Sequence, residues 1–135
     1  MPIRFMLDID VSVSSDCRGL KDLGNNASSI TSDAYNEGGS QRTLIPAAST
    51  DKVIPLDDIA NVGVLYLKVQ PVDANDPGQV IGIRLNDVAN DLISIFPMSG
   101  KKVGYFLLTS DAVTSLFVTN AGTVDVALTM IIAGD

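Results

Sequence analysis

Residues 116–135, at the end of the chain, carry the pattern that constrains the fold most. Large apolar residues occupy every even position of the last run, namely Val124, Val126, Leu128, Met130 and Ile132. This period of two is typical of a β-strand with one buried face. Another apolar run at residues 116–119 precedes it, and the intervening Asn120, Ala121 and Gly122 suit a hairpin loop, because Asn and Gly tolerate a positive φ. We therefore predict a closing antiparallel hairpin, since this row of apolar side chains would otherwise face water.

The same period opens the chain. Residues 3–13 place apolar residues at alternate positions, namely Ile3, Phe5, Leu7, Ile9, Val11 and Val13. We predict a long strand packed against the core. Asp8 and Asp10 fall on the opposite face, about 7 Å apart by the rise of a strand. Two carboxylates at this spacing suit a calcium site or an acid–base pair, but a solvated face that protects an edge strand is the interpretation we favour.

Residues 14–41 differ in composition from the rest of the chain. They are rich in Ser, Asn, Asp and Gly, and their few apolar anchors are Leu20, Leu23, Ile30 and Tyr35. We predict a long excursion with one short strand near residues 27–31. A loop of this length in a compact domain usually has a function or is poorly ordered.

Turn-forming residues then recur about every ten residues, which is the spacing of β-sandwiches and barrels. The apolar runs between them predict strands at residues 42–47, 52–56, 64–69, 80–85, 92–96 and 103–108. Pro46 and Pro55 place the first two strands at an edge or a bend. Residues 56–61 fit a single helical turn, and no segment sustains a helical period. The chain of 135 residues is therefore predicted to be one all-β domain, an antiparallel β-sandwich resembling a jelly roll.

Composition argues against several classes of protein. The chain has no His, so the usual general base and the usual zinc ligand are missing. Cys17 is the only cysteine, which rules out an internal disulfide and, without His, a papain-like nucleophile. The net charge of −7 disfavours nucleic acid as a partner. No apolar run reaches the roughly eighteen residues of a membrane span, and residues 1–4 lead into a strand-like alternation rather than a signal peptide.

Three fragments imitate catalytic or binding motifs. Residues 73–78 begin like a calcium loop, but Pro77 occupies a ligand position and Arg84 stands where the bidentate Glu is needed, so only a looser calcium site stays open. Ser99 and Lys102 have the Ser-x-x-Lys spacing of penicillin-recognising enzymes without their other motifs, and a turn at Ser99-Gly100 explains them better. Residues 100–102 lack the rest of a P-loop. We predict no catalytic, metal or cofactor site, and no enzymatic activity.

Two stretches resemble small virion proteins of tailed bacteriophages. The first runs from Leu20-Lys21-Asp22-Leu23-Gly24 through a Ser-rich stretch to Arg42-Thr43-Leu44-Ile45. The second contains Val53-Ile54-Pro55-Leu56, Leu65-Tyr66-Leu67-Lys68-Val69, Met98-Ser99-Gly100, Phe106-Leu107-Leu108 and residues 120–132. Together they cover most of the chain. Proteins of this kind are β-sandwiches, often jelly rolls, that decorate the capsid or sit in the tail.

The resemblance implies a viral structural protein, in the first place a capsid decoration or cement protein that binds and stabilises the phage head. Its expected partners are the major capsid protein and further copies of itself, because residues 64–69 and 103–108 are apolar on both faces. We expect a dimer or trimer, made in the host cytoplasm and located on the capsid surface. The alternative is a phage tail or receptor-binding, carbohydrate-recognising β-sandwich module, although Trp, the best sugar platform, is absent. The candidate interface residues are Ile3, Phe5, Leu7, Leu20, Leu23, Ile30 and Tyr35.

Overall fold

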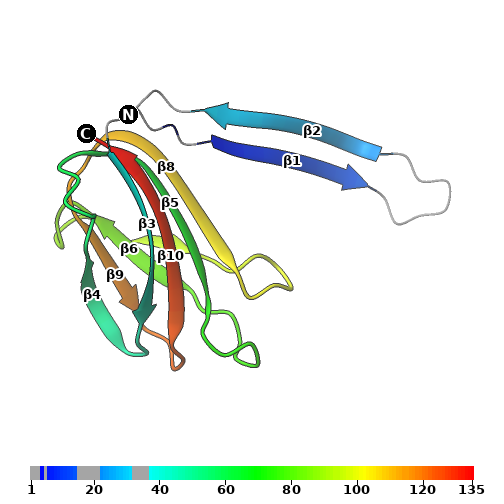
Figure 1. The fold of residues 1–135 in the computed structure, drawn as a ribbon. Coiled ribbons are helices and arrows are strands. Elements are labelled where there is room, and N and C mark those ends of the chain that lie inside the picture. Colours follow the sequence, from blue (N-terminus) through cyan, green and yellow to red (C-terminus); the bar gives the residue numbers. More distant parts are fainter. Residues whose placement is uncertain (1–3, 5, 15–21, 32–36) are drawn as a thin grey trace.

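The computed structural model describes residue 4 and residues 6–14, 22–31 and 37–135. These residues form β-strands and connections, without a helix (Figure 1). The strands are β1 (Met6–Ser14), β2 (Asp22–Thr31), β3 (Glu37–Ile45), β4 (Ser49–Ile54), β5 (Val62–Pro71), β6 (Ile81–Leu85), β7 (Ile93–Ile95), β8 (Gly104–Val113), β9 (Leu116–Asn120) and β10 (Val126–Gly134). The strands predicted between residues 42 and 108 are all present, with boundaries that differ by a few residues.

Strands β3 to β10 form two four-stranded sheets that pack face to face. The first sheet has the order β3-β10-β5-β8 and the second has the order β4-β9-β6-β7. Every neighbouring pair is antiparallel. The predicted all-β antiparallel sandwich is therefore confirmed.

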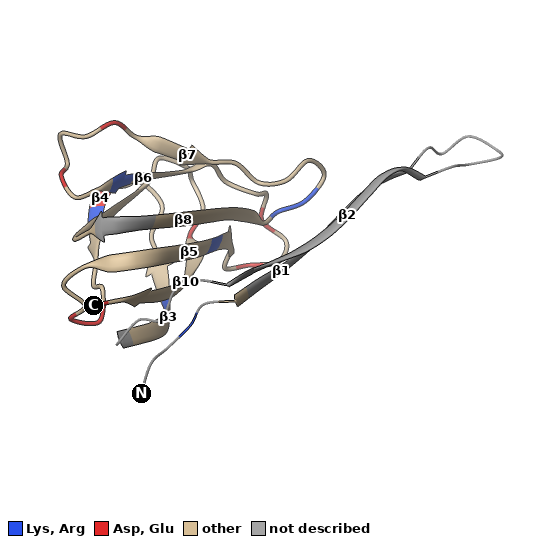
Figure 2. Cartoon of the chain, turned by 90° about the horizontal axis from the view of Figure 1, so that it is seen from above, with Lys and Arg blue, Asp and Glu red and all other residues tan. Residues whose placement is uncertain are grey.

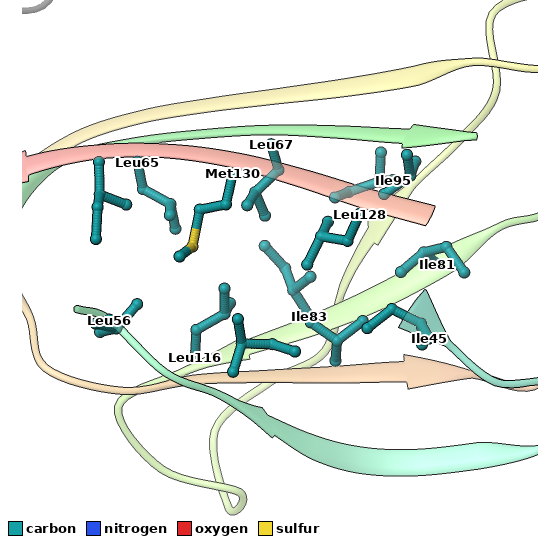
Figure 3. Close-up of a cluster of buried hydrophobic side chains, with 14 of the residues drawn as sticks. Ile45, Leu56, Leu65, Leu67, Ile81, Ile83, Ile95, Leu116, Leu128 and Met130 are labelled. Carbon is teal, nitrogen blue, oxygen red and sulfur yellow. The ribbon is translucent and has the colours of Figure 1, made fainter. Parts of the chain in front are cut away.

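Period-two alternation generates the core between the two sheets. Along β10, Val126, Leu128, Met130 and Ile132 are buried, as the sequence predicts, whereas Val124 lies in the connection before β10 and is half-buried. Leu65 and Leu67 of the central strand β5 are also inaccessible to solvent. Figure 3 shows side chains of β5 and β10 pointing toward Ile83 of β6 and Leu116 of β9. Burial of these large apolar side chains from both sheets supplies the main stabilisation, roughly 1.5–3 kcal/mol for each.

The connection between β9 and β10 contradicts the predicted closing hairpin. β9 pairs with β4 and β6 in the second sheet, whereas β10 pairs with β3 and β5 in the first. Residues 121–125 therefore carry the chain from one sheet across to the other. A hairpin and such a crossing both bury alternate residues of the two strands, so the alternation itself does not distinguish between them.

Asn120 fixes this crossing. Its side chain is fully buried, and its amide nitrogen donates to the carbonyl oxygens of Val124 at 2.9 Å and Ile45 at 3.3 Å. Its amide oxygen accepts a hydrogen bond from the backbone N–H of Gly122 at 3.0 Å. The carboxylate of Asp125 accepts from the backbone N–H of Ala47 at 2.9 Å. The crossing from β9 to β10 is thus tied to the neighbouring connection between β3 and β4.

Prolines lie where the sequence predicts edges. Pro46 and Pro55 directly follow β3 and β4, which are the outer strands of the two sheets. The predicted helical turn at residues 56–61 is wrong. Asp57 and Asp58 have φ values of 51° and 60°, and the N–H of Ile59 donates to the carbonyl oxygen of Leu56 at 2.9 Å. Two consecutive positive φ values make a left-handed turn, which Asp tolerates better than most residues.

Strands β1 and β2 form a separate two-stranded sheet, which we call the ribbon. Within the described residues β1 pairs with β2 alone, and Figure 1 shows the ribbon extending away from the sandwich. The sequence correctly predicts the strand at residues 6–13, but that strand joins neither sheet of the sandwich. β2 spans ten residues of the predicted excursion at residues 14–41, more than the short strand expected there. Its Ser and Asn residues do not prevent this, because strand pairing uses backbone hydrogen bonds.

Candidate interaction surface

The edge strands β7 and β8 lie on the same side of the sandwich, which we call the β7–β8 side (Figure 2). The connection between them is tight, because the N–H of Met98 donates to the carbonyl oxygen of Val103 at 3.0 Å. Gly104 begins β8 where the backbone comes close: a Cβ atom there would lie 2.7 Å from the carbonyl oxygen of Phe96. A glycine at position 104 therefore allows the β7–β8 connection to pass close to the start of β8.

Exposed apolar side chains gather on and near this side. Among the side chains that the structure describes, half of the exposed large apolar residues lie between residues 80 and 98, namely Val80, Val88, Leu92, Ile93, Phe96 and Met98. Phe96 is 66% exposed, although a phenylalanine in a connection would usually fold back onto the core. Such a concentration of exposed apolar area makes this side the candidate interaction surface.

Charged residues flank these apolar side chains. Figure 2 shows the sandwich strands mostly without charge and the acidic residues mainly in loops. Asp87 and Asp91 lie in the connection between β6 and β7, next to Val88 and Leu92. Lys101 and Lys102 follow Met98, and the ammonium of Lys102 donates to the carbonyl oxygen of Ala74. The apolar residues therefore have acidic residues at one end and two lysines at the other, a composition that resembles a protein interface with a polar rim.

The outer face of the first sheet carries a second, smaller apolar cluster beside β8. Val64 and Ala133 are buried there, and Tyr66 and Leu107 pack against them. The ring centres of Tyr66 and Tyr105 lie 6.4 Å apart. Burial raises the pKa of the Tyr66 phenol, and the neighbouring Tyr105 raises this pKa further. Tyr105, on the edge strand β8, is 49% exposed and connects this cluster to the β7–β8 side.

The outer face of the second sheet satisfies its charges internally. Arg84 on β6 pairs with the carboxylate of Asp51 at 2.5 Å and donates from Nε to the carbonyl oxygen of Asn90 at 3.0 Å. The hydroxyl of Thr119 accepts from the backbone N–H of Asp51 at 3.0 Å. This network holds Asp51 at a φ of 46°, where β4 is irregular. The network fixes the edge strand β4, and the geometry assigns it a structural role.

A pocket of about 470 Å³ opens at one end of the sandwich. Asp57 and Asp58 line it from the left-handed turn, and Thr114 and Ser115 line it from the connection between β8 and β9. The carboxylate and hydroxyl oxygen atoms of these four residues can form hydrogen bonds with a polar ligand. The described part of the chain contains no group of three or more Asp, Glu or Cys residues that could hold a metal ion.

The structure places three of the seven predicted interface residues, all in the ribbon. Leu7 and Ile30 are opposite each other in the β1–β2 pairing, and Leu23 lies in β2 near an irregularity of that pairing. The remaining four lie outside the described residues: Ile3, Phe5, Leu20 and Tyr35. Sequence reasoning missed the β7–β8 side, although Phe96-Pro97-Met98 next to Ser99-Gly100 places large apolar residues directly beside a turn.

The motif-like fragments are turns in the structure. The carboxylate of Asp73 accepts from the backbone N–H of Asn75 at 2.9 Å, and the N–H of Asp76 donates to the carbonyl oxygen of Asp73 at 3.0 Å. The predicted turn at Ser99-Gly100 is confirmed, since the N–H of Lys101 donates to the carbonyl oxygen of Met98 at 2.8 Å. Gly100 has a φ of 69°, as such a turn requires.

No family model, no curated protein and no solved structure matches this chain. Among the described residues, no helix has the length and apolar character needed to cross a membrane.

Proposed function

We propose that this protein is a structural component of a tailed-phage virion, a capsid decoration or cement protein that binds the head and catalyses nothing. The observation that carries the proposal is the strand order of the sandwich. From β3 to β10 the chain changes sheets at every step except β6 to β7, and the first and last of these strands are neighbours. This connectivity is expected of a jelly roll, an architecture common among viral capsid proteins and lectins. It adds to the sequence resemblance to phage virion proteins.

Within the β7–β8 side, residues 92–98 are the surface we propose to contact the head, which leaves the edge of β8 uncovered by the head. The exposed residues Leu92, Phe96 and Met98 supply apolar area, and the two lysines lie at one end. Most acidic residues of the sandwich, residues 37–135, lie in loops, where they keep unassembled copies soluble at high concentration. Because the contact is mainly apolar, we expect its affinity to depend weakly on salt.

A cement role follows from mass action. A protein that binds the assembled lattice and not the free subunits adds its binding free energy to the assembled state. The experiment strips the protein from purified particles and follows DNA release during heating, with and without added protein. Release at a higher temperature after adding it back supports the proposal. Equal release temperatures in the two samples would rule out the cement role.

A matched pair of variants locates the contact. Phe96 and Val53 are 66% and 64% exposed, but only Phe96 lies on the β7–β8 side, since Val53 is on β4. Phe96→Ser should weaken particle binding at least about tenfold, because an anchor in an interface contributes about 2 kcal/mol or more. Val53→Ser removes a similarly exposed apolar group and should leave binding unchanged. Equal effects of the two substitutions would place the contact elsewhere.

The second candidate is a phage tail or receptor-binding module that recognises carbohydrate. The end pocket favours it, because Asp57, Asp58, Thr114 and Ser115 present oxygen atoms suited to sugar hydroxyl groups. A glycan array tests this candidate directly. Binding of the wild-type chain that is lost in Asp57→Asn would make the receptor-binding module the better assignment.

A further inference from the structure

The four outer strands of the sandwich differ in how they are protected against pairing with another chain. β3 carries Glu37 and Arg42 and is followed by Pro46. β4 is irregular at Asp51, which has a positive φ, and is followed by Pro55. β7 is only three residues long. Charge, proline, irregularity and shortness are the devices that prevent an edge strand from adding a further strand.

The edge of β8 lacks these devices over most of its length. Residues 104–109 pair regularly with β5 and contain neither a charge nor a proline. Within the described residues β8 has no neighbour on its other side, so alternate N–H and C=O groups point away from the sheet. Phe106 and Leu108 pack against the core and stay partly exposed. A strand added here would complete both the hydrogen bonding and the burial.

The ribbon, in turn, needs a further strand beside it. A two-stranded sheet alone is at best marginally stable in water. Leu7, Ile9 and Val11 occupy alternate positions of β1. Ribbon strands pair only with each other among the described strands, so each also has one unpaired backbone edge.

We propose that β1 of one copy pairs with the edge of β8 on a second copy, so that the first sheet continues into the partner's ribbon. The lengths agree, since β1 has nine residues and β8 has ten. Addition of a strand to an open sheet edge is a common mode of recognition.

This inference is independent of the virion assignment. It requires a second copy of the chain and no particle, so self-association and particle binding can fail separately. It also identifies one specific contact, whereas apolar exposure alone indicates only that some surface is covered.

Disulfide trapping tests the contact directly. Cys17 is replaced by Ser, and single cysteines are then introduced into two sets of full-length chains. One set carries Asp8→Cys or Asp10→Cys in β1, and the tagged second set carries Tyr105→Cys or Thr109→Cys in β8. The four mixtures sample different registers of the pairing. We expect a disulfide-linked species of mixed composition in at least one mixture and none when Val53→Cys on β4 replaces the β8 variants.

Sedimentation supplies the second measurement. The wild-type chain should associate reversibly above its monomer mass of 14.2 kDa. Tyr105→Lys adds a charge to the β8 edge and should weaken association at least about tenfold, whereas the matched Val53→Lys should not. A monomer at about 100 μM would overturn the proposal, because dimers are well populated at that concentration even when the dissociation constant is as weak as about 100 μM. An oligomer that both lysine variants leave intact, without mixed disulfides, would overturn it as well.

Discussion

The buried side chain of Asn120 should be one of the most sensitive polar positions in the sandwich. Asn120→Ala removes two hydrogen bonds donated to Ile45 and Val124 and one accepted from Gly122. A neutral hydrogen bond contributes about 1 kcal/mol net, and a buried group left without a partner costs about 1–3 kcal/mol. The bond to Ile45 is long at 3.3 Å and counts for less. We therefore expect the free energy of unfolding to fall by about 3 kcal/mol.

Asn120→Asp separates the hydrogen bonds by type. The carboxylate still accepts from Gly122, but its second oxygen faces the carbonyl oxygens of Ile45 and Val124 where the amide donated. Burial and these carbonyl groups raise the folded-state pKa of the introduced carboxyl above its unfolded value of about 3.9. Protonation therefore favours the folded variant. Its loss of stability relative to wild type should be greatest at neutral pH and should shrink as the pH falls through the raised pKa.

Urea unfolding measures both effects. The midpoint should decrease while the dependence of free energy on urea stays unchanged, because the exposed surface of the unfolded chain is the same. Asn75→Ala is the control, since Asn75 is an exposed turn residue and surface substitutions usually stay within about 0.5 kcal/mol. If Asn120→Ala changes stability as little as this control, or if Asn120→Asp shows no recovery at low pH, the side-chain hydrogen bonds of Asn120 are not what stabilises the crossing from β9 to β10.

Three further predictions concern other parts of the chain. Gly134→Ala should cost about 2 kcal/mol in urea unfolding, because its Cβ would lie 2.1 Å from the backbone oxygen of Asn61, whereas Gly100→Ala meets open space and should cost only about 1 kcal/mol for its positive φ. The raised pKa of Tyr66 means that stability should fall as the pH rises above about 10, and less so in Tyr66→Phe; an equal fall in both would exclude this tyrosine as the cause. Deletion of residues 1–13 should reduce particle binding more than solubility, and aggregation of the truncated chain would show instead that β1 is needed for folding.

Local patterns predicted most of the strands because burial and turn chemistry act over a few residues. The alternation along β10 identified Val126, Leu128, Met130 and Ile132 as buried, and Pro46 and Pro55 marked one edge of each sheet. Turn residues separated the strands between residues 42 and 108. In each case the sequence alone contains the determining interaction, which lies within one strand or one turn.

Long-range partners decided the features that the sequence could not predict. Asn120-Ala121-Gly122 suits a hairpin loop, but Asn120 bonds to Ile45, which lies 75 residues earlier. Nothing local to residues 116–135 indicates that bond. The β7–β8 side was missed for the same reason. Phe96 and Met98 are apolar residues, and only the folded structure shows that they are exposed.

The ribbon shows why an alternating strand does not by itself identify a core strand. The alternation of Leu7, Ile9 and Val11 predicts a strand with one buried face, because the removal of apolar side chains from water is favourable. The need for a buried face is the same whether the cover comes from the same chain or from another one. β10 meets it inside the sandwich, with strands on both sides. β1 has only β2 beside it in the described structure, and the open edge of β8 provides a place for it on a second copy. The alternating strand β1 and the unprotected edge of β8 are therefore better interpreted together than separately, as the two halves of one contact between chains.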